Sequence, residues 1–232
     1  MVSNKTSQSI TDLMYMEFTA IQKLFIWAIP IIFAVTFHEM AHGWVASLCG
    51  DKTADRLGRL SPNPLRHIDP IGTILVPAVL YFFGGFLFGW AKPVPVDWRN
   101  LRHQRRDMAL VALAGPVANL VMVFIWAGIA KLALMFQQAD VWVATILVHM
   151  GLAGIMMNIM LCLFNLIPIP PLDGSRVVSS CLKPAWAWQY ERIERYSLIL
   201  LLLLLVTGIL SKVLLPLVQM IVLFIIRLFG LY

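Results

Sequence analysis

Long uninterrupted hydrophobic runs, rather than alternating patterns, dominate the chain. Runs at about residues 21–48, 108–136 and 141–166 each exceed the roughly 20 residues that an α-helix needs to cross a bilayer. A last stretch, residues 197–229, predicts a helical hairpin around Ser211 and Lys212 or, alternatively, one long helix kinked near Pro216. The pattern predicts an all-α polytopic integral membrane protein with a core of three transmembrane helices and a C-terminal helical hairpin.

The hydrophobic run at residues 71–91 is interrupted by Pro77, Gly84 and Gly85, and basic loops flank it on both sides. Cytoplasmic loops carry an excess of lysine and arginine, so both loops are expected on the inner side. A chain segment that returns to its own side is re-entrant and must be buried in protein. We therefore expect a re-entrant or short extended element here, with a full span as the open alternative.

Composition agrees with a membrane protein. Of 232 residues, 60% are hydrophobic and 13% are charged, which excludes an ordinary soluble domain. The net charge is +6, and the basic residues lie in short loops between apolar runs. They therefore indicate how the chain is oriented in a bilayer and not a nucleic-acid partner. Three scattered cysteines form no disulfide framework. We expect one membrane-embedded domain over residues 1–232, with a core at about 21–180 and C-terminal helices at about 196–230.

Three ionisable residues, His38, Glu39 and His42, lie within the first apolar run. A charged residue at the centre of a membrane helix costs roughly 2.5 to 3.5 kcal/mol, so these side chains need partners. Residues four apart share one helix face, so both imidazoles can bind one metal ion. The pattern His-Glu-x-x-His is typical of zinc metalloproteases, in which the glutamate acts as a base. A buried hydrogen-bonded cluster without metal is the alternative.

Asp173 follows the third predicted helix, within Leu172-Asp173-Gly174. Alone, this tripeptide is typical of a solvated turn. If residues 71–91 do not cross the membrane, however, Asp173 and His42 lie on the same side. Catalytic zinc commonly takes three protein ligands and a water molecule. We therefore predict one Zn²⁺ per chain, bound by His38, His42 and Asp173.

Several motifs together resemble the site-2 protease family of intramembrane zinc metalloproteases, in its compact prokaryotic branch without a PDZ domain. The similarity covers about residues 33–180. The motifs are His38-Glu39-Met40-Ala41-His42, Ala114-Gly115-Pro116-Val117-Ala118-Asn119, Asn165-Leu166-Ile167-Pro168 and Leu172-Asp173-Gly174, with Gly58-Arg59-Leu60-Ser61-Pro62-Asn63-Pro64 and His67-Ile68-Asp69-Pro70.

The resemblance implies cleavage of transmembrane substrate proteins within the bilayer, with Glu39 as catalytic base. It implies that Asn165 helps to hold substrate or the oxyanion, although an interhelical hydrogen bond explains this residue equally well. It also implies that substrate docks as an added strand near residues 55–69 or 92–96. The expected location is the bacterial cytoplasmic membrane, with several spans and the active site toward the cytoplasm.

Other functions remain as alternatives. A membrane zinc-binding scaffold would also carry such ligands, but it has no need of Glu39. A zinc transporter is expected to offer ligands at several depths and not at one site. A different protease class uses a glutamate as third ligand, and the glutamates that follow Glu39 are Glu191 and Glu194. The remaining polar residues are assigned structural roles: Asn119 to packing, His67 and His103 to solvated loops, and His149 to the core.

Overall fold

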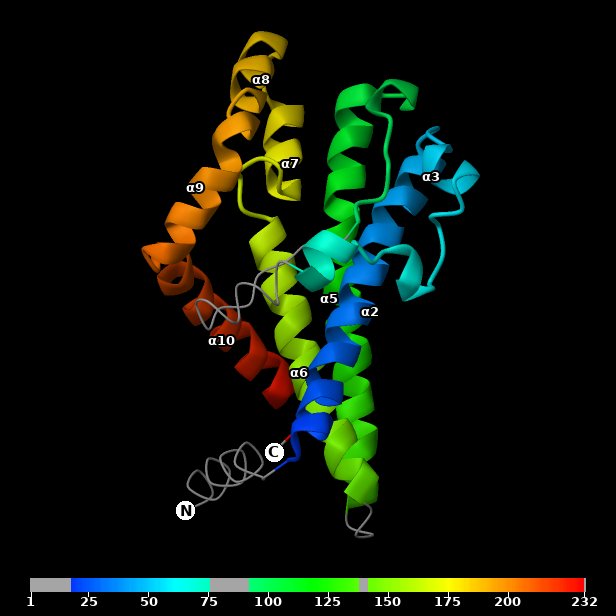
Figure 1. Cartoon of the computed structure of the whole chain (residues 1–232), viewed down its shortest axis with the longest axis vertical. Helices are drawn as coiled ribbons and strands as arrows, with labels where there is room; N and C mark the ends of the chain where they lie inside the picture. Colours follow the sequence, from blue (N-terminus) through cyan, green and yellow to red (C-terminus); the bar gives the residue numbers. More distant parts are fainter. Residues whose placement is uncertain (1–17, 76–91, 138–141, 232) are drawn as a thin grey trace. The chain divides into compact units, whose positions relative to one another are not determined.

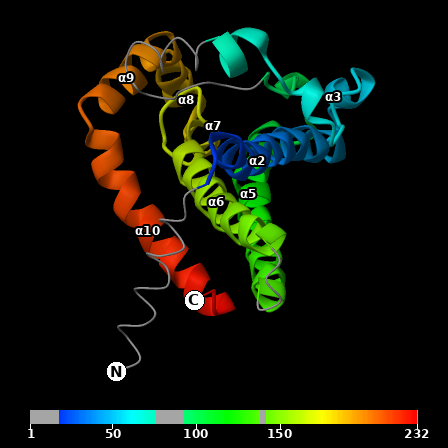
Figure 2. The same ribbon diagram turned by 60° about the horizontal axis from the view of Figure 1, so that its bottom comes forward.

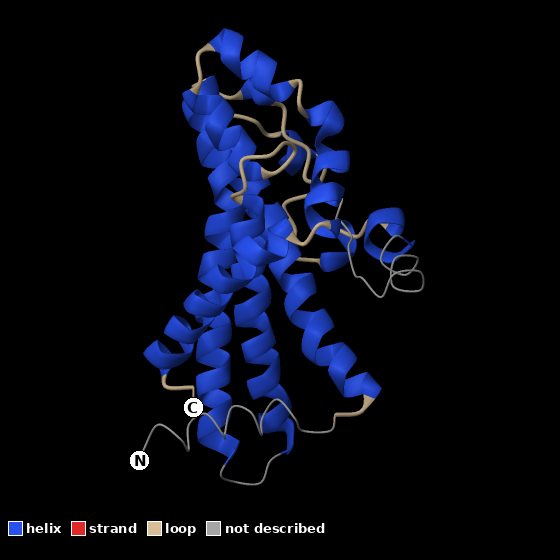
Figure 3. Cartoon of the chain, turned by 90° about the vertical axis from the view of Figure 1, so that its left-hand side faces the viewer, coloured by secondary structure: helices blue, strands red, loops and turns tan. Residues whose placement is uncertain are grey.

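The computed structural model describes residues 18–75, 92–137 and 142–231, and the regular secondary structure of these residues is helical (Figure 3). Four long helices are α2 (Ala20–Leu48), α5 (Gln104–Gln137), α6 (Trp142–Asn165) and α10 (Ile209–Phe229) (Figure 1). The shorter helices are α3 (Thr53–Arg56), η1 (Pro64–Arg66), η2 (Pro70–Leu75), η3 (Trp98–Asn100), α7 (Asp173–Cys181), α8 (Pro184–Glu191) and α9 (Glu194–Val206).

Among the described residues, these four long helices are apolar and long enough to cross a membrane. The prediction of an all-α polytopic membrane protein is confirmed. The first three spans begin and end within a few residues of the predicted runs, because each run is long, apolar and bounded by polar or glycine-containing turns.

The predicted re-entrant element falls mostly on residues 76–91, which lie outside the described residues. Its start is described as η2, a short π-helix. Asp69 caps this turn, since its Oδ1 accepts hydrogen bonds from the backbone N–H groups of Ile71, at 2.9 Å, and Gly72, at 2.8 Å. Whether residues 71–91 return to their own side stays a prediction.

The chain divides into two compact units, each built from separate stretches of sequence. The first unit comprises residues 1–34, 119–164 and 200–232, and the second comprises residues 35–118 and 165–199. All the predicted zinc ligands belong to the second unit. The expectation of one domain over residues 1–232 stays a prediction.

In the first unit, α5 and α6 lie side by side (Figures 1 and 2). A Cβ atom at Gly151 would lie 2.7 Å from the Cβ of Ala130, and one at Gly154 would overlap the ring of Trp126. Small residues of this kind let membrane helices approach closely. The glycines of α6 therefore set the separation of the two helices.

Asn119 has a more specific role than the predicted packing. Its side chain is fully buried, and Nδ2 donates hydrogen bonds to Oδ1 of Asn158, at 3.0 Å, and to the carbonyl of Ala34, at 3.2 Å. Asn158 in turn donates to the carbonyl of Gly154. This buried polar bridge joins residues of α2, α5 and α6. It gives each amide hydrogen-bond partners, which a polar group needs away from water.

The C-terminal pair of helices breaks at Thr207 and Gly208, and not at Ser211-Lys212 or Pro216 as predicted. Gly208 has φ +70°, a conformation that glycine adopts without steric cost. From this break α10 runs on from the end of α9 instead of folding back beside it (Figure 2). The carbonyl of Gly230, after α10, accepts a 3.1 Å hydrogen bond from Nζ of Lys131 in α5.

In the second unit, the loop before α5 is bound to the end of α2 through Asp51, which has no exposed surface. Its Oδ2 accepts a hydrogen bond from the backbone N–H of Asp97, at 2.8 Å. Its Oδ1 accepts from Nδ2 of Asn100, at 3.1 Å, and from both the N–H and the hydroxyl of Thr53. Buried charge of this kind is stable only when hydrogen-bonded, and Asp51 therefore anchors the loop.

One prediction about this loop region, that for His67, was wrong. Within residues 55–69 the structure has the end of α3 and the short helix η1, joined by loops. His67 is not solvated: its side chain is buried, and Nε2 lies 2.9 Å from the carbonyl of Ser61. His103 is exposed, as predicted, and His149 is half-buried.

Candidate metal centre

His38 and His42 lie one turn apart on α2, so their rings share one face of the helix. The two Nε2 atoms lie 3.1 Å apart. Nδ1 of His42 donates to the carbonyl of Val111 in α5, at 2.7 Å, which leaves the lone pair of Nε2 directed toward His38. The local sequence thus places two nitrogen ligands at one point.

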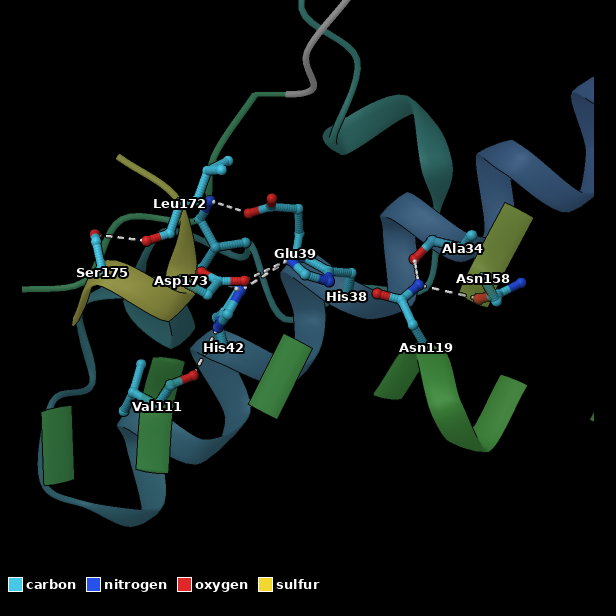
Figure 4. A network of polar contacts seen from close by, with 11 residues as sticks. Ala34, His38, Glu39, His42, Val111, Asn119, Asn158, Leu172, Asp173 and Ser175 are labelled. Carbon is cyan, nitrogen blue, oxygen red and sulfur yellow. Dashed lines mark hydrogen bonds and ion pairs between the residues drawn. The ribbon is translucent and has the colours of Figure 1, made fainter. Parts of the chain in front are cut away.

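Asp173 reaches the same point from the first residue of α7 (Figure 4). Its Oδ2 lies 3.2 Å from Nε2 of His38, and its Oδ1 lies 3.4 Å from Nε2 of His42. Gly174 allows this approach, because a Cβ atom there would overlap the carbonyl of Leu166 and lie 2.8 Å from that of Ile167. The structure thus brings together the three predicted ligands, whose donor atoms all lie within 4.8 Å of one another.

The donor set fits zinc. Two ligand atoms that bind one tetrahedral zinc ion through bonds of about 2.0 to 2.1 Å are about 3.3 Å apart, close to the separations found here. Oδ2 of Asp173 is buried and faces Nε2 of His38, but it accepts no hydrogen bond from the described residues, so it is free to bind a cation. Burial raises the pKa of Asp173, but the facing imidazoles of His38 and His42 outweigh it and hold that pKa at about 2, so the group is a carboxylate.

Glu39 is held apart from this cluster. Its Oε2 accepts a 2.8 Å hydrogen bond from the backbone N–H of Val94, in the loop before α5. Gly43, one turn along α2, lets the loop come this close, because a Cβ atom there would lie 2.8 Å from Cγ1 of Val94 and 2.6 Å from Cδ2 of Leu60. Glu39 is therefore positioned next to the cluster without being one of its donors.

The loop around Val94 is fixed on both sides. Nη2 of Arg59 donates to the carbonyls of Lys92, at 2.9 Å, and Pro93, at 3.3 Å. Beyond Val94, the Asp51 carboxylate holds the N–H of Asp97. The non-helical segment from residue 92 to residue 97 therefore presents the Val94 amide to Glu39 in a defined position.

Arg176 fixes α7, the helix that begins with Asp173. Its guanidinium forms ion pairs with Glu194, at 3.2 Å, and Glu191, at 3.8 Å. Glu191 also accepts a hydrogen bond from the hydroxyl of Ser179, at 2.6 Å. Both glutamates thus serve α7 and are not part of the metal-binding group, which disfavours a glutamate as third ligand.

The remaining predicted residue, Asn165, is the last residue of α6 and is half-buried. Its role stays a prediction. Sequence reasoning missed two supporting groups, the N–H of Val94 and the carbonyl of Val111. Both are backbone atoms, so no side-chain pattern could have indicated them. The glycines at positions 43 and 174, each next to a predicted ligand, were the available signal for close packing.

Helices able to cross a membrane, together with a His-Glu-x-x-His helix that meets an aspartate, define the class of membrane zinc metalloproteases. The profile of the family described as peptidase family M50 matches residues 128–208, which include Asp173 but not His38 and His42. Relatives matched over most of the chain extend the similarity to the N-terminal part. The chain belongs to peptidase family M50, the site-2 proteases.

YwhC of Bacillus subtilis (strain 168), named as a candidate zinc metalloprotease, is 40% identical over 194 residues, which are 82% of this chain and 84% of YwhC. Rip2 of Mycolicibacterium smegmatis, named in the same way, is 26% identical over 78% of this chain and 66% of its own length. A candidate zinc metalloprotease of Methanocaldococcus jannaschii is 35% identical over 61% of this chain and 63% of its own length. No solved structure matches the chain.

Proposed function

We propose that this protein is an intramembrane zinc metalloprotease that hydrolyses peptide bonds within transmembrane segments of other membrane proteins. The observation that carries the proposal is the meeting of His38, His42 and Asp173 at separations suited to one zinc ion, beside a separately held Glu39. A glutamate next to a metal-bound water is the arrangement with which zinc metalloproteases hydrolyse peptide bonds.

The proposed roles follow from the geometry. His38, His42 and Asp173 hold the zinc ion, which lowers the pKa of a water molecule and polarises the scissile carbonyl. Glu39 takes the proton of that water and passes it to the departing amine. The Val94 amide holds Oε2 of Glu39, leaving Oε1 for the proton.

Substrate must unwind locally, because a transmembrane helix hides its peptide groups in its own hydrogen bonds. The segment of residues 92–97 forms no helix and lies against Glu39 at Val94. Of the two edges implied by the family resemblance, we therefore propose docking at residues 92–96. We further propose that Asn165 holds substrate or the oxyanion, although an interhelical hydrogen bond stays the alternative.

We place the protein in the bacterial cytoplasmic membrane with this site toward the cytoplasm, since the basic residues gather in loops on the site's side of the predicted topology. The lipid bilayer and a transmembrane substrate protein are then its partners, and nucleic acid is not. The competing functions are those of a zinc-binding scaffold or a zinc transporter. They are disfavoured because neither needs a general base such as Glu39.

The test is zinc content together with cleavage of a reporter transmembrane substrate by purified, reconstituted protein. Glu39→Gln should retain zinc and lose about 10²- to 10⁴-fold in rate, the range for general-base catalysis. Asp173→Ala should lose both zinc and activity. Equal zinc binding in the wild type and both variants, without cleavage by any of them, would exclude Asp173 and favour the scaffold or transporter.

A further inference from the structure

We propose that Gly115 is a positioning residue for the metal centre: its lack of a side chain lets both imidazoles rest directly on the backbone of α5. The inference depends on the metal site of the proposed function, and it concerns how the ligands are placed. The role proposed for Gly115 is to position the ligands and not to bind zinc or substrate.

The geometry around Gly115 leaves no room for a side chain. A Cβ atom built there would lie 2.5 Å from Cε1 of His38, 2.6 Å from its Nε2, and 2.5 Å from Nε2 of His42. These separations are far below van der Waals contact. Moreover, Nε2 is the atom with which each ring would bind the metal, so an atom added at Gly115 would crowd the metal-binding atoms themselves.

Val111 gives the same face of α5 a second function. Val111 and Gly115 are four residues apart on α5, as His38 and His42 are on α2. At one position the carbonyl of Val111 accepts the hydrogen bond of His42 Nδ1, at 2.7 Å, and fixes the orientation of that ring. At the next turn, the bare backbone of Gly115 limits how closely both rings can approach α5.

A different explanation of Gly115 is that it precedes Pro116, because proline disfavours helical conformation in the residue before it. The chain itself argues against this. Pro30 lies inside α2 and Pro216 inside α10, and the residues before them are Ile29 and Leu215. Proline within a helix of this protein thus tolerates a large preceding side chain. The contact with the imidazoles remains as the requirement for glycine.

Gly128 supplies a matched control in the same helix. A Cβ atom at Gly128 would meet no atom within 4 Å. Alanine is the better helix former, so Gly128→Ala should leave zinc binding unchanged and the helix no less stable. A difference between the two substitutions then cannot be a general effect of replacing a glycine in α5 by alanine.

The first experiment measures zinc affinity by chelator competition and the absorption spectrum of the cobalt-substituted protein, which reports coordination geometry. Gly115→Ala should weaken zinc binding roughly 10- to 100-fold, the range found when groups supporting metal ligands are lost. It should also alter the cobalt spectrum, whereas Gly128→Ala should change neither. Wild-type affinity and spectrum in Gly115→Ala would overturn the proposal.

The second experiment needs no metal and applies even if Gly115→Ala alone does not fold. Thermal unfolding of metal-free protein is compared for the His38→Ala/His42→Ala variant with and without Gly115→Ala. Removing the rings removes the clash, so Gly115→Ala should be tolerated in this background and not in wild type. An equal loss in both backgrounds would mean that glycine is needed because it precedes Pro116, and would refute the proposal.

The two proposals fail in different ways. If the wild-type protein binds no zinc, the proposed function fails, but the unfolding comparison still tests Gly115. If the wild type binds zinc and Gly115→Ala binds it equally well, only the role of Gly115 is lost.

Discussion

The backbone N–H of Val94 and Oε2 of Glu39 form a 2.8 Å hydrogen bond between residues 55 positions apart. Glu39 lies on α2, and Val94 lies in an extended loop that Arg59 and Asp51 hold from either side. Among the described residues, the proposed catalytic base is therefore oriented by the main chain at Val94. Most substitutions of Val94 leave its backbone N–H in place. Proline has no backbone N–H and therefore removes the donor.

Val94→Pro should lower kcat roughly tenfold or more relative to Val94→Ala, since a hydrogen bond to a charged group contributes about 1.5 to 3 kcal/mol. Both variants lose the valine side chain, and only the proline variant loses the N–H. Zinc content should be equal in the two. Equal kcat values would mean that the Val94 amide does not orient Glu39.

Asp51 should make stability depend on acid pH. Burial raises its pKa, but hydrogen bonds from Thr53, Asn100 and Asp97 outweigh burial and lower it. A folded-state pKa below the unfolded value gives stability that is present above about pH 4 and lost as the pH falls through the folded-state pKa. Asp51→Asn should therefore cost about 1.5 to 3 kcal/mol at pH 7, and the difference should shrink below about pH 4.

The measurement is thermal unfolding in detergent from about pH 3 to about pH 7. This range extends to both sides of the ordinary aspartate pKa of about 3.9. Asp55→Asn is the control, because Asp55 is exposed in α3. It should follow the wild type across the range. A destabilisation by Asp51→Asn that stays constant down to pH 3 would show that its carboxylate charge is not the cause.

Asn119 and Asn158 should be energetically coupled. A double-mutant cycle with alanine at both positions should give a coupling of about 0.6 kcal/mol, the average for polar pairs in membrane proteins. Asn119→Ala combined with Asn100→Ala should be additive, because Asn100 bonds to Asp51 whereas Asn119 bonds to Asn158 and Ala34. A coupling of zero for Asn119 and Asn158 would mean that their 3.0 Å hydrogen bond does not contribute to the free energy of unfolding.

Glu191→Gln and Glu194→Gln should keep zinc, whereas Asp173→Asn should lose it. The two glutamates pair with Arg176 at a partly exposed site, and such ion pairs contribute about 0 to 1 kcal/mol. Zinc analysis of the three purified variants checks this. Loss of zinc from Glu191→Gln alone would reinstate the protease class with a glutamate ligand.

Local sequence pattern was sufficient for the features that depend on neighbours along the chain. The ends of α2, α5 and α6 follow from apolar runs, and the shared face of His38 and His42 follows from their spacing. The loop charges added one long-range inference, the meeting of Asp173 with the histidines, which the geometry bears out.

Features that depend on distant packing could not be predicted. The burial of His67, the bridge made by Asn119 and the contact of Val94 with Glu39 each join separate parts of the chain. The C-terminal break was sought at a charge or a proline, yet Lys212 and Pro216 both lie within α10. Gly208 determines the break through a backbone conformation that composition alone does not reveal.

His42 and Asp173 are separated by about 130 residues of chain. At a synthesis rate of about 5 to 20 residues per second, roughly 7 to 26 seconds pass between the synthesis of His42 and that of Asp173. During that interval the membrane holds two histidines and a glutamate whose ligand partner has not been made. A nascent chain therefore cannot complete this three-residue centre until Asp173 has been made.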